Sequence, residues 1–426
     1  MKAKTLLKTR VYNAFRLAIT LTLVLSVVLF SGCSEKRALK EVVNYINDYS
    51  VIVEEVSYDE IISIGVRGVL AQDKYAKYYS KAEYELDKQQ DDGKYSGFGL
   101  NFIVGTNEIF SVVYNSPAER AGIKAGSIIN TISYNNFVYE IQDYEDVSRA
   151  LSSVKTGEQA IFCIEREIPD GLEELTLTLT KEEFKAGYVL YQDNEKELRV
   201  RTNEKGDFYL KEFLENKNAL LPDGVAYIKF TEFNGDAPYQ LEQALNYAKA
   251  NEKNKLILDL RSNGGGRLDI LQEVCAILLP TTAKKGDLLV NAHLKNGSKD
   301  YCLKAQGEND YILDMVVLAN SNTASASEAL IGSLNYYGAG GFSLDKLVCE
   351  YNGKRDDFST YGKGVMQTTF SLSSGGAIKL TTATIYQPDR KTCIQGVGIA
   401  PSVSQNEIRG NDRSKALTRA VQILAS

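Results

Sequence analysis

The sequence predicts an α/β protein of several domains, on three observations. The chain has 426 residues, which is enough for two or three domains. From about residue 224 onward strand-like and helix-like runs alternate, as they do in domains built on parallel strands. Residues 91–183 instead hold short strand-like runs around one short helical run, with glycines between them, which predicts a smaller β-rich domain.

The composition excludes some classes of function. Hydrophobic residues make up 44% of the chain and charged residues 24%, as in an ordinary globular protein. The net charge of -6 gives no basic surface, so we expect no nucleic-acid partner. No C-x-x-C pair is present, so we expect no zinc site. The motifs of the chain imply no other metal and no cofactor. Cys275 lies in an apolar helical run and is predicted to be in the core.

The N-terminus has the layout of a secretory signal peptide, assigned to residues 1–32. A basic head is followed by the uncharged run 17–30, which is shorter than the ~20 residues that span a bilayer. The ending "FSGCS" resembles a lipobox, with Phe30 where Leu is usual. That resemblance implies lipidation at Cys33, export to the bacterial cell envelope and anchoring to the membrane. A plain signal peptide or a signal anchor is the alternative.

Residues 33–90 read as a linker that turns into a charged helical region rich in tyrosine. In the β-rich segment that follows, one helix is predicted from apolar residues at i, i+3, i+4 and i+7. These are Val147, Ala150, Leu151 and Val154, and Gly157 is expected to end the helix.

The segment 91–183 resembles a PDZ domain. The stretch "SPAERAGIKAGSII" carries most of this resemblance, although Ser127 stands where Asp is common. "SGFGL" occupies the place of the PDZ loop that binds a terminal carboxylate, and backbone N–H groups of a glycine-rich loop can capture such a group. The resemblance therefore implies a substrate-binding loop made of Gly97, Phe98, Gly99 and Leu100.

Residues 184–426 form the larger predicted α/β domain. Its expected strands and helices alternate along the chain: strand 224–235, helix 239–251, strand 255–266, helix 268–280, strand 314–320 and helix 325–338.

Two strand ends in this domain carry groups suited to chemistry, "LILDLRSNGGG" and "VVLANSNTASASE". Reacting groups gather at the carboxyl ends of parallel strands. A serine hydroxyl on one loop and glycine N–H groups on the other are the minimum for acyl transfer. The usual base is histidine, but the chain has 1 His. That residue, His293, lies in a strand that ends at a turn and is expected at the surface, and nothing else supports a triad that uses it.

Five motifs together resemble the C-terminal processing peptidases, or tail-specific proteases, which are serine proteases that work without histidine. In chain order they are "DLRSNGGG", "NTASASEAL", "TYGKGVMQ", "GGAIKLTTATIYQP" and "IQGVGIAP". The resemblance covers about residues 40–425. It implies a ClpP/crotonase-like α/β protease core with an inserted or preceding PDZ-like domain and N-terminal helices, which by family analogy can form a homodimer.

The same resemblance assigns roles to residues. It makes Ser325 the nucleophile, Lys363 the general base and Gln367 the residue that orients the lysine. It places the oxyanion donors at the backbone N–H of Ala326 and of Gly264 or Gly265. The implied substrate is a polypeptide with a free C-terminus. A lysine serves as base only when its pKa falls from ~10.4 toward neutrality, which an apolar pocket can bring about.

One departure from the family pattern is the spacing of 38 residues between Ser325 and Lys363, which is longer than usual because of a polar loop. Lys354 lies in that loop as a second candidate base, but Lys363 has the flanking glycines and the later glutamine. Ser325 and Glu328 also form a capping-box pattern, so a plain helix cap is the modest alternative for Ser325. Asp259 and Arg261 are interpreted as structural.

Two other functions remain open from the sequence. The runner-up is a non-catalytic peptide-binding scaffold lipoprotein of the same fold, and a different acyl hydrolase such as an amidase is disfavoured. Residues 152–157, "SSVKTG", contain fragments typical of penicillin-binding enzymes, but here a single lysine would serve both motifs, so we treat the match as chance.

Overall fold

A computed structural model describes residues 57–426, together with residues 40, 43–44 and 47–48. The predicted signal peptide, Cys33 and Lys354 lie outside the described residues. Within the range 57–426, the structure does not describe residues 104, 169–170, 204, 206, 215–219, 281–282, 295–300, 306–312, 352–357 and 406–413. The described chain forms two units, one from residues up to 81 with 369–380, and the other from 82–368 with 381–426.

The first unit contains helix α2 (Tyr58–Leu70) and strand β1 (Lys77–Tyr79). Ser57 caps α2, because its hydroxyl accepts from the Glu60 N–H at 3.2 Å and the Glu60 carboxylate accepts from the Ser57 N–H at 2.6 Å. Strand β1 pairs antiparallel with the first residues of β20 (Ala377–Tyr386). The expectation of helix before residue 90 is confirmed by α2 and by α3 (Lys81–Asp91), whereas β1 was not foreseen.

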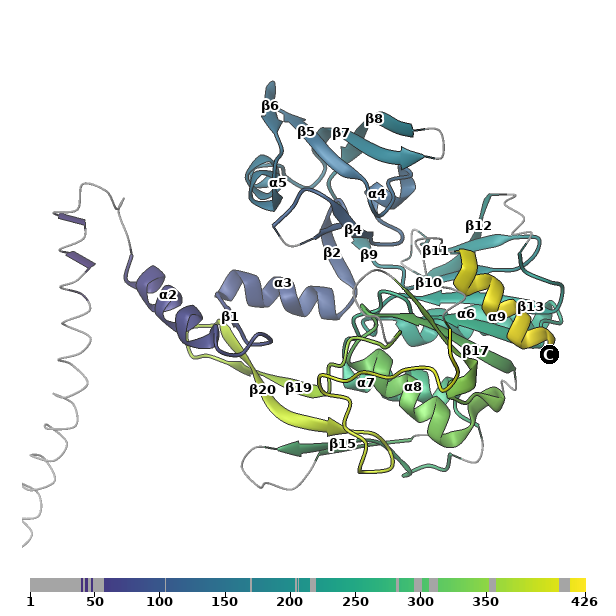
Figure 1. Ribbon diagram of the computed structural model, residues 1–426. Helices are drawn as coiled ribbons and strands as arrows, with labels where there is room; N and C mark the ends of the chain where they lie inside the picture. The colour runs from purple at the N-terminus through teal and green to yellow at the C-terminus, as the bar shows by residue number, and fades with distance from the viewer. Residues whose placement is uncertain are drawn as a thin grey trace, which may run out of the picture. The chain divides into compact units, whose positions relative to one another are not determined.

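The second unit is built on a seven-stranded sheet in the order β12-β11-β10-β13-β14-β17-β18 (Figure 1). The expectation of parallel strands is confirmed for β13, β14, β17 and β18. Their residues are almost all buried, as is usual for parallel strands that are covered on both faces. Their bounds are β13 (Val225–Phe230), β14 (Lys255–Asp259), β17 (Asp314–Asn320) and β18 (Leu347–Glu350).

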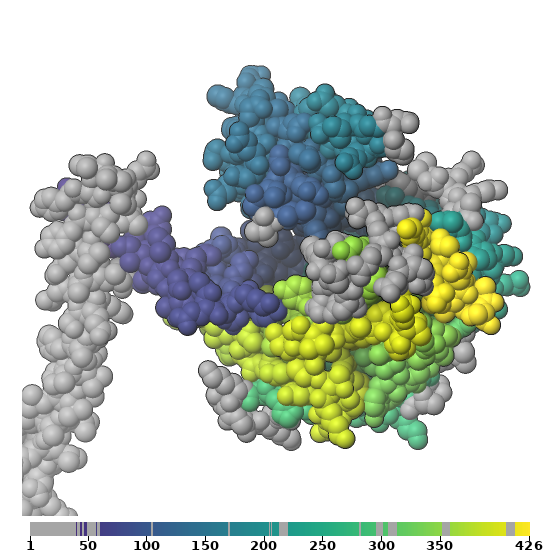
Figure 2. All heavy atoms as spheres, in the orientation of Figure 1, coloured from purple at the N-terminus to yellow at the C-terminus, as the bar shows by residue number. Residues whose placement is uncertain are grey.

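Three antiparallel strands extend this sheet, and the sequence patterns did not indicate them. They are β10 (Val189–Gln192), β11 (Glu197–Thr202) and β12 (Phe208–Leu214). The predicted helices of this region are confirmed as α6 (Ala237–Ala250), α7 (Leu268–Leu278) and α8 (Ala326–Tyr337). The C-terminal helix α9 (Ser414–Ala425, yellow in Figure 2) packs against β17 and β18. Cys275 on α7 is fully buried, as predicted.

Residues 94–185 form a β-rich module with a hydrophobic core of its own, centred on Phe98, Ile129, Ile132 and Phe162. Strands β5, β6, β7 and β8 make a four-stranded sheet, while β2 pairs with β9 and β3 with β4. The bounds are β2 (Lys94–Gly97), β3 (Leu100–Phe102), β4 (Ile109–Val112), α4 (Pro117–Arg120), β5 (Ile128–Tyr134), β6 (Phe137–Glu140), α5 (Tyr144–Leu151), β7 (Gln159–Ile168), β8 (Gly171–Thr180) and β9 (Glu182–Lys185).

The helix predicted over Val147–Val154 is shorter than expected. Helix α5 ends at Leu151, and Ser152 follows with its hydroxyl donating to the Arg149 carbonyl at 2.8 Å. Such a local bond offers the backbone an alternative to continuing the helix. Val154 is still buried in the same core, so the apolar pattern predicted its burial correctly. The pattern placed the end of the helix one turn too late.

The remaining strands form a second sheet. Strand β20 pairs with β15 (Leu288–Leu294), β15 pairs with β16 (Tyr301–Lys304), and β19 (Val365–Ser371) pairs with β20. Two short 3-10 turns, Ala339–Gly341 and Leu344–Lys346, precede β18. Among the described residues no helix has the length and apolar character needed to cross a membrane.

Candidate active site

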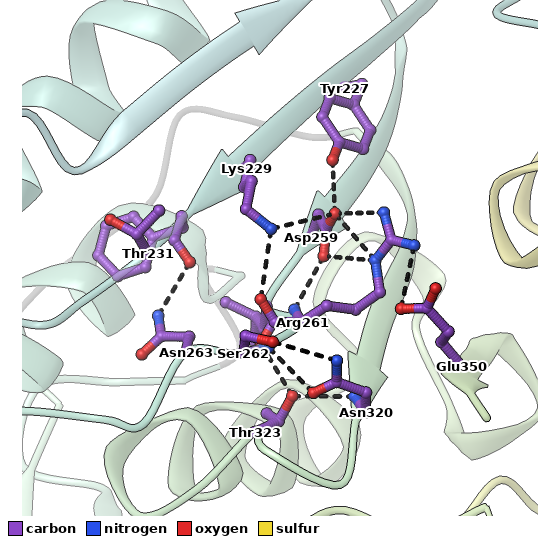
Figure 3. Close-up of polar contacts among 12 residues, drawn as sticks. Tyr227, Lys229, Thr231, Asp259, Arg261, Ser262, Asn263, Asn320, Thr323 and Glu350 are labelled. Atoms are coloured by element: carbon purple, nitrogen blue, oxygen red, sulfur yellow. Dashed lines mark hydrogen bonds and ion pairs between the residues drawn. The ribbon is translucent and has the colours of Figure 1, made fainter. Parts of the chain in front are cut away.

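The two strand ends singled out in the sequence meet in the structure, because β14 and β17 are parallel neighbours. Asn320 is the main link between them (Figure 3): its Oδ1 accepts from the Ser262 N–H at 3.0 Å. The Thr323 hydroxyl donates to the Leu260 carbonyl at 2.8 Å, and the Ala324 N–H donates to the Asn263 carbonyl at 3.0 Å. These bonds hold the "SNGGG" loop against the loop that carries Ser325.

Ser325 is the N-cap residue of α8 and has an unusual backbone conformation, with φ 58° and ψ -116°. Positive φ is rare for a residue with a Cβ and costs on the order of 1–3 kcal/mol. A strained serine at a strand-to-helix turn is also how α/β-hydrolases present a nucleophile. Ser327, in contrast, is fully buried and its hydroxyl donates to the Asn263 carbonyl at 3.0 Å, so its role is structural.

We expect Ser325→Gly to raise the free energy of unfolding by about 1 kcal/mol relative to Ser325→Ala, because glycine adopts this conformation without strain. Both variants lack the hydroxyl, so any difference between them reports backbone strain. Chemical denaturation of the two proteins measures it. Equal stability would show that the turn at Ser325 is not strained.

Gly265 lies directly against the candidate nucleophile. A Cβ on Gly265 would lie 2.8 Å from the Ser325 Cβ and 2.9 Å from the Ala326 N, while one on Gly264 would meet nothing within 4 Å. The Gly265 N–H donates to Asn263 Oδ1 at 2.9 Å. As an oxyanion donor, Gly265 would therefore have to exchange that acceptor for the substrate oxygen.

Glu328 joins the serine loop to the lysine loop, a role that the sequence analysis did not assign. Its carboxylate is fully buried and accepts from the N–H groups of Ser325, Gly362 and Lys363 at 2.8, 2.7 and 2.9 Å. The Thr360 hydroxyl donates to it as well. Burial raises the pKa of the Glu328 carboxyl above its ordinary value, and these four hydrogen bonds oppose that shift. The Ser-x-x-Glu pattern was visible in the sequence, but it pointed only to a helix cap.

The glycines on either side of Lys363 allow a close approach of two backbone segments. A Cβ on Gly362 would lie 2.9 Å from the Gly398 N, and one on Gly364 would lie 2.6 Å from the Gln395 N. The segment "IQGVGIAP" thus packs against the "GKG" turn. Gln367 lies on β19, and its Nε2 donates to the Thr381 hydroxyl at 3.4 Å.

A buried ion-pair network supports the strand end below the "SNGGG" loop (Figure 3). Asp259 is fully buried, and its Oδ2 lies 2.6 Å from Arg261 Nη2 and 3.7 Å from Lys229 Nζ. Tyr227 donates its hydroxyl to the same carboxylate. Burial alone would raise the pKa of Asp259, but Arg261 and Lys229 together with the hydrogen bonds hold it well below its ordinary value. Asp259 and Arg261 thus form an ion pair at the strand end, and their structural interpretation stays a prediction.

The predicted carboxylate-binding loop of the β-rich module is present as a turn between β2 and β3. Phe98 is buried in the core against the Phe162 ring, so only its backbone is available to a ligand. The carbonyl groups of Phe98 and Gly99 accept from Ala118 and Val113 at 3.0 and 2.9 Å. Gly99 has φ +81°, and a Cβ there would collide with Ser116.

His293, the single histidine of the chain, was expected at the surface. His293 is exposed, packs edge-on against the Tyr386 ring at 4.7 Å and has Asn291 2.9 Å from its Nε2. The described residues hold no group of three or more His, Cys, Asp or Glu side chains placed to bind a metal ion.

Comparisons with known proteins find similarity over the region that contains these residues. Residues 224–405 match the model of peptidase family S41. The chain is 26% identical over 357 residues to the "Probable CtpA-like serine protease" of Staphylococcus aureus (strain bovine RF122 / ET3-1), covering 82% of this chain and 60% of that protein. It is 27% identical over 339 residues to "Carboxyl-terminal-processing peptidase 2, chloroplastic" of Arabidopsis thaliana, covering 77% of this chain and 57% of that protein. The match thus spans about 60% of the length of these curated relatives.

The fold is also similar to a solved S41 protease structure from Bacteroides fragilis NCTC 9343. The TM-score is 0.51 at 18% identity, and the alignment covers 91% of this chain and 96% of the other. The chain is therefore similar to peptidase family S41 over residues 224–405, and the solved structure supports the mixed α/β fold with several sheets.

Proposed function

We propose that this chain is a serine endopeptidase of the C-terminal processing type, with Ser325 as nucleophile and Lys363 as general base. The observation that carries the proposal is the shared acceptor Glu328 Oε2, which receives the N–H of Ser325 and the N–H of Lys363 at 2.8 and 2.9 Å. The backbones of two residues that are 38 positions apart in the sequence therefore bind the same oxygen atom.

In the proposed reaction, neutral Lys363 takes the proton of the Ser325 hydroxyl while the serine oxygen attacks the scissile carbonyl carbon. The oxyanion that forms would accept from the backbone N–H of Ala326 and of Gly264 or Gly265. The intermediate collapses to an acyl-enzyme, and the amine that leaves takes its proton from Lys363. Water then attacks the ester with Lys363 again as base, which releases the second product and restores the serine.

Recognition and location form the second part of the proposal. The core of the β-rich module suits a PDZ-like domain, and its loop Gly97–Leu100 would bind the free C-terminal carboxylate of a polypeptide through backbone N–H groups. Lipidation at Cys33 would hold the enzyme at the outer side of a bacterial membrane. Gln367 would orient the Lys363 side chain.

The test uses the chain without residues 1–33 and an unstructured protein with an apolar C-terminus, with cleavage followed by mass spectrometry. We expect cleavage by wild type that increases with pH as a lysine-like group loses its proton, and at least about a 1,000-fold loss in Ser325→Ala and in Lys363→Ala. Lys354→Ala serves as the matched control and should cleave like wild type.

Two outcomes would contradict the proposal. Cleavage that survives Ser325→Ala would exclude this serine as nucleophile. Binding of the tail without cleavage by any form would instead favour a peptide-binding scaffold.

A further inference from the structure

The segment that joins β13 to α6, residues 231–235, lies against the candidate oxyanion loop. The Phe233 N–H donates to the Gly265 carbonyl at 2.9 Å, and the Arg267 N–H donates to the Phe233 carbonyl at 2.9 Å. Gly266 touches Phe233 so closely that a Cβ there would lie 2.4 Å from the Phe233 oxygen. The position of this segment therefore determines where the Gly265–Gly266 backbone lies.

The other side of the segment contacts the end of α3, just before the chain enters the β-rich module. The Gly235 N–H donates to the Asp91 carbonyl at 3.0 Å, and a Cβ on Gly235 would lie 2.8 Å from the Gly93 Cα. The segment thus connects the entry to the β-rich module with the oxyanion loop.

Glu232 and Asn234 flank Phe233 and contact each other. The Asn234 Nδ2 donates to Glu232 Oε1 at 2.9 Å. Asn234 is 6% exposed, and its Oδ1 is buried with no hydrogen-bond partner among the described residues. Leaving a buried amide oxygen without a hydrogen-bond donor costs roughly 1–3 kcal/mol of stability. The carboxyl group of Glu232, when it carries a proton, is a donor beside this oxygen.

Acidic and phenolic groups face Glu232 from each neighbouring element. The charge of Asp91 on α3 acts on Glu232, and Asp92 and Asp236 lie close by in the chain. Tyr95 on β2 and Tyr188 before β10 also face it. The cation of this region, Arg267, pairs with Asp269 at 2.6 Å and Asp92 at 3.5 Å. Burial, and then the charge of Asp91, raise the pKa of Glu232 to about 7.

We propose that Glu232 is a positioning residue for the oxyanion loop, acting as a neutral carboxyl group that forms two reciprocal hydrogen bonds with the Asn234 amide. In this form the Glu232 O–H donates to Asn234 Oδ1, while Asn234 Nδ2 donates to the other carboxyl oxygen. Loss of the proton removes one of the two bonds and places a negative charge beside Asp91. Phe233, which lies between the two residues in the chain, then holds Gly265 less firmly.

The pH dependence follows from linkage. The carboxyl binds its proton more tightly in the folded protein than in the unfolded chain. Its stabilising contribution is therefore complete below the unfolded value near 4.5 and is lost as the pH rises through about 7. The effect on catalysis rests on the proposed function, whereas the effect on stability does not.

The test compares wild type with Glu232→Gln, because a glutamine amide can form the same pair of bonds with Asn234 at every pH. The matched control is Glu242→Gln, on the exposed face of α6. We expect equal thermal unfolding midpoints at pH 5, and at pH 8 a higher midpoint for Glu232→Gln than for wild type and the control. Hydrogen exchange of the peptide that covers residues 231–235, corrected for intrinsic rates, should become faster with pH in wild type and in the control, but not in Glu232→Gln.

Activity gives the readout that a purely structural role would not move. The kcat/KM of Glu232→Gln divided by that of wild type should increase about threefold or more between pH 5 and pH 8. This factor is the loss of activity expected when wild type loses one hydrogen bond. If the unfolding midpoints and the hydrogen-exchange rates change with pH as expected but no form of the protein cleaves the substrate, Glu232 still positions the loop and the proposed function is wrong. Parallel pH profiles of unfolding for all three proteins, or failure of Glu232→Gln to fold, would overturn the inference.

Discussion

Gly265→Ala should lower kcat/KM at least about 100-fold, which is the scale of losing one oxyanion donor. The added Cβ would lie 2.8 Å from the Ser325 Cβ and 2.9 Å from both the Ala324 oxygen and the Ala326 N. It cannot be accommodated without moving the nucleophile or the proposed donors. Steady-state cleavage of an unstructured substrate measures the loss.

The matched control is Gly286→Ala, because it separates backbone strain from collision. Gly286 has φ +97° against +101° at Gly265, but a Cβ there meets nothing within 4 Å. Both variants should lose on the order of 1–3 kcal/mol of stability from strain, and only Gly265→Ala should lose activity. An active Gly265→Ala enzyme would mean that this loop does not form the catalytic site.

Asp259→Asn should lower the free energy of unfolding by about 3–5 kcal/mol, because it leaves the charges of Arg261 and Lys229 without their buried partner. Arg261 keeps Glu350, whose carboxylate lies 3.4 Å away. The pKa of Asp259 is held below its ordinary value, so its stabilising contribution is present above about pH 4 and is lost as the pH falls below that value. The stability gap between wild type and the variant should therefore narrow in acid.

Urea denaturation at several pH values checks this, with Asp223→Asn as the control. Asp223 pairs with Lys253 at 3.1 Å, but its side chain is 90% exposed, so its loss should cost much less stability than the loss of Asp259. Equal costs for the two variants would show that the network at Asp259 is not a structural support.

The local pattern of the sequence identified most elements around the site. The runs "KLILD" and "DMVVLAN" have uninterrupted apolar centres, as is typical of buried parallel strands, and both are strands in the sheet. The two strand ends singled out in the sequence also meet, because parallel neighbours place their carboxyl ends at the same edge of the sheet. The antiparallel strands β10–β12 were missed, because charged and aromatic residues obscure the alternation of apolar and polar residues along them.

By itself, the sequence determined which residues are chemically suited to acyl transfer: a serine at a strand-to-helix turn, a lysine between glycines and a glycine-rich loop. Spacing, composition and local propensity are properties of short stretches, so they can be read without the fold. Only the tertiary structure decided that Glu328 joins the serine to the lysine, that Gly265 touches Ser325, and that the Glu232–Asn234 pair lies behind the oxyanion loop. These contacts join segments far apart in the chain, and they depend on strand order and on the exact paths of loops, which local patterns do not encode.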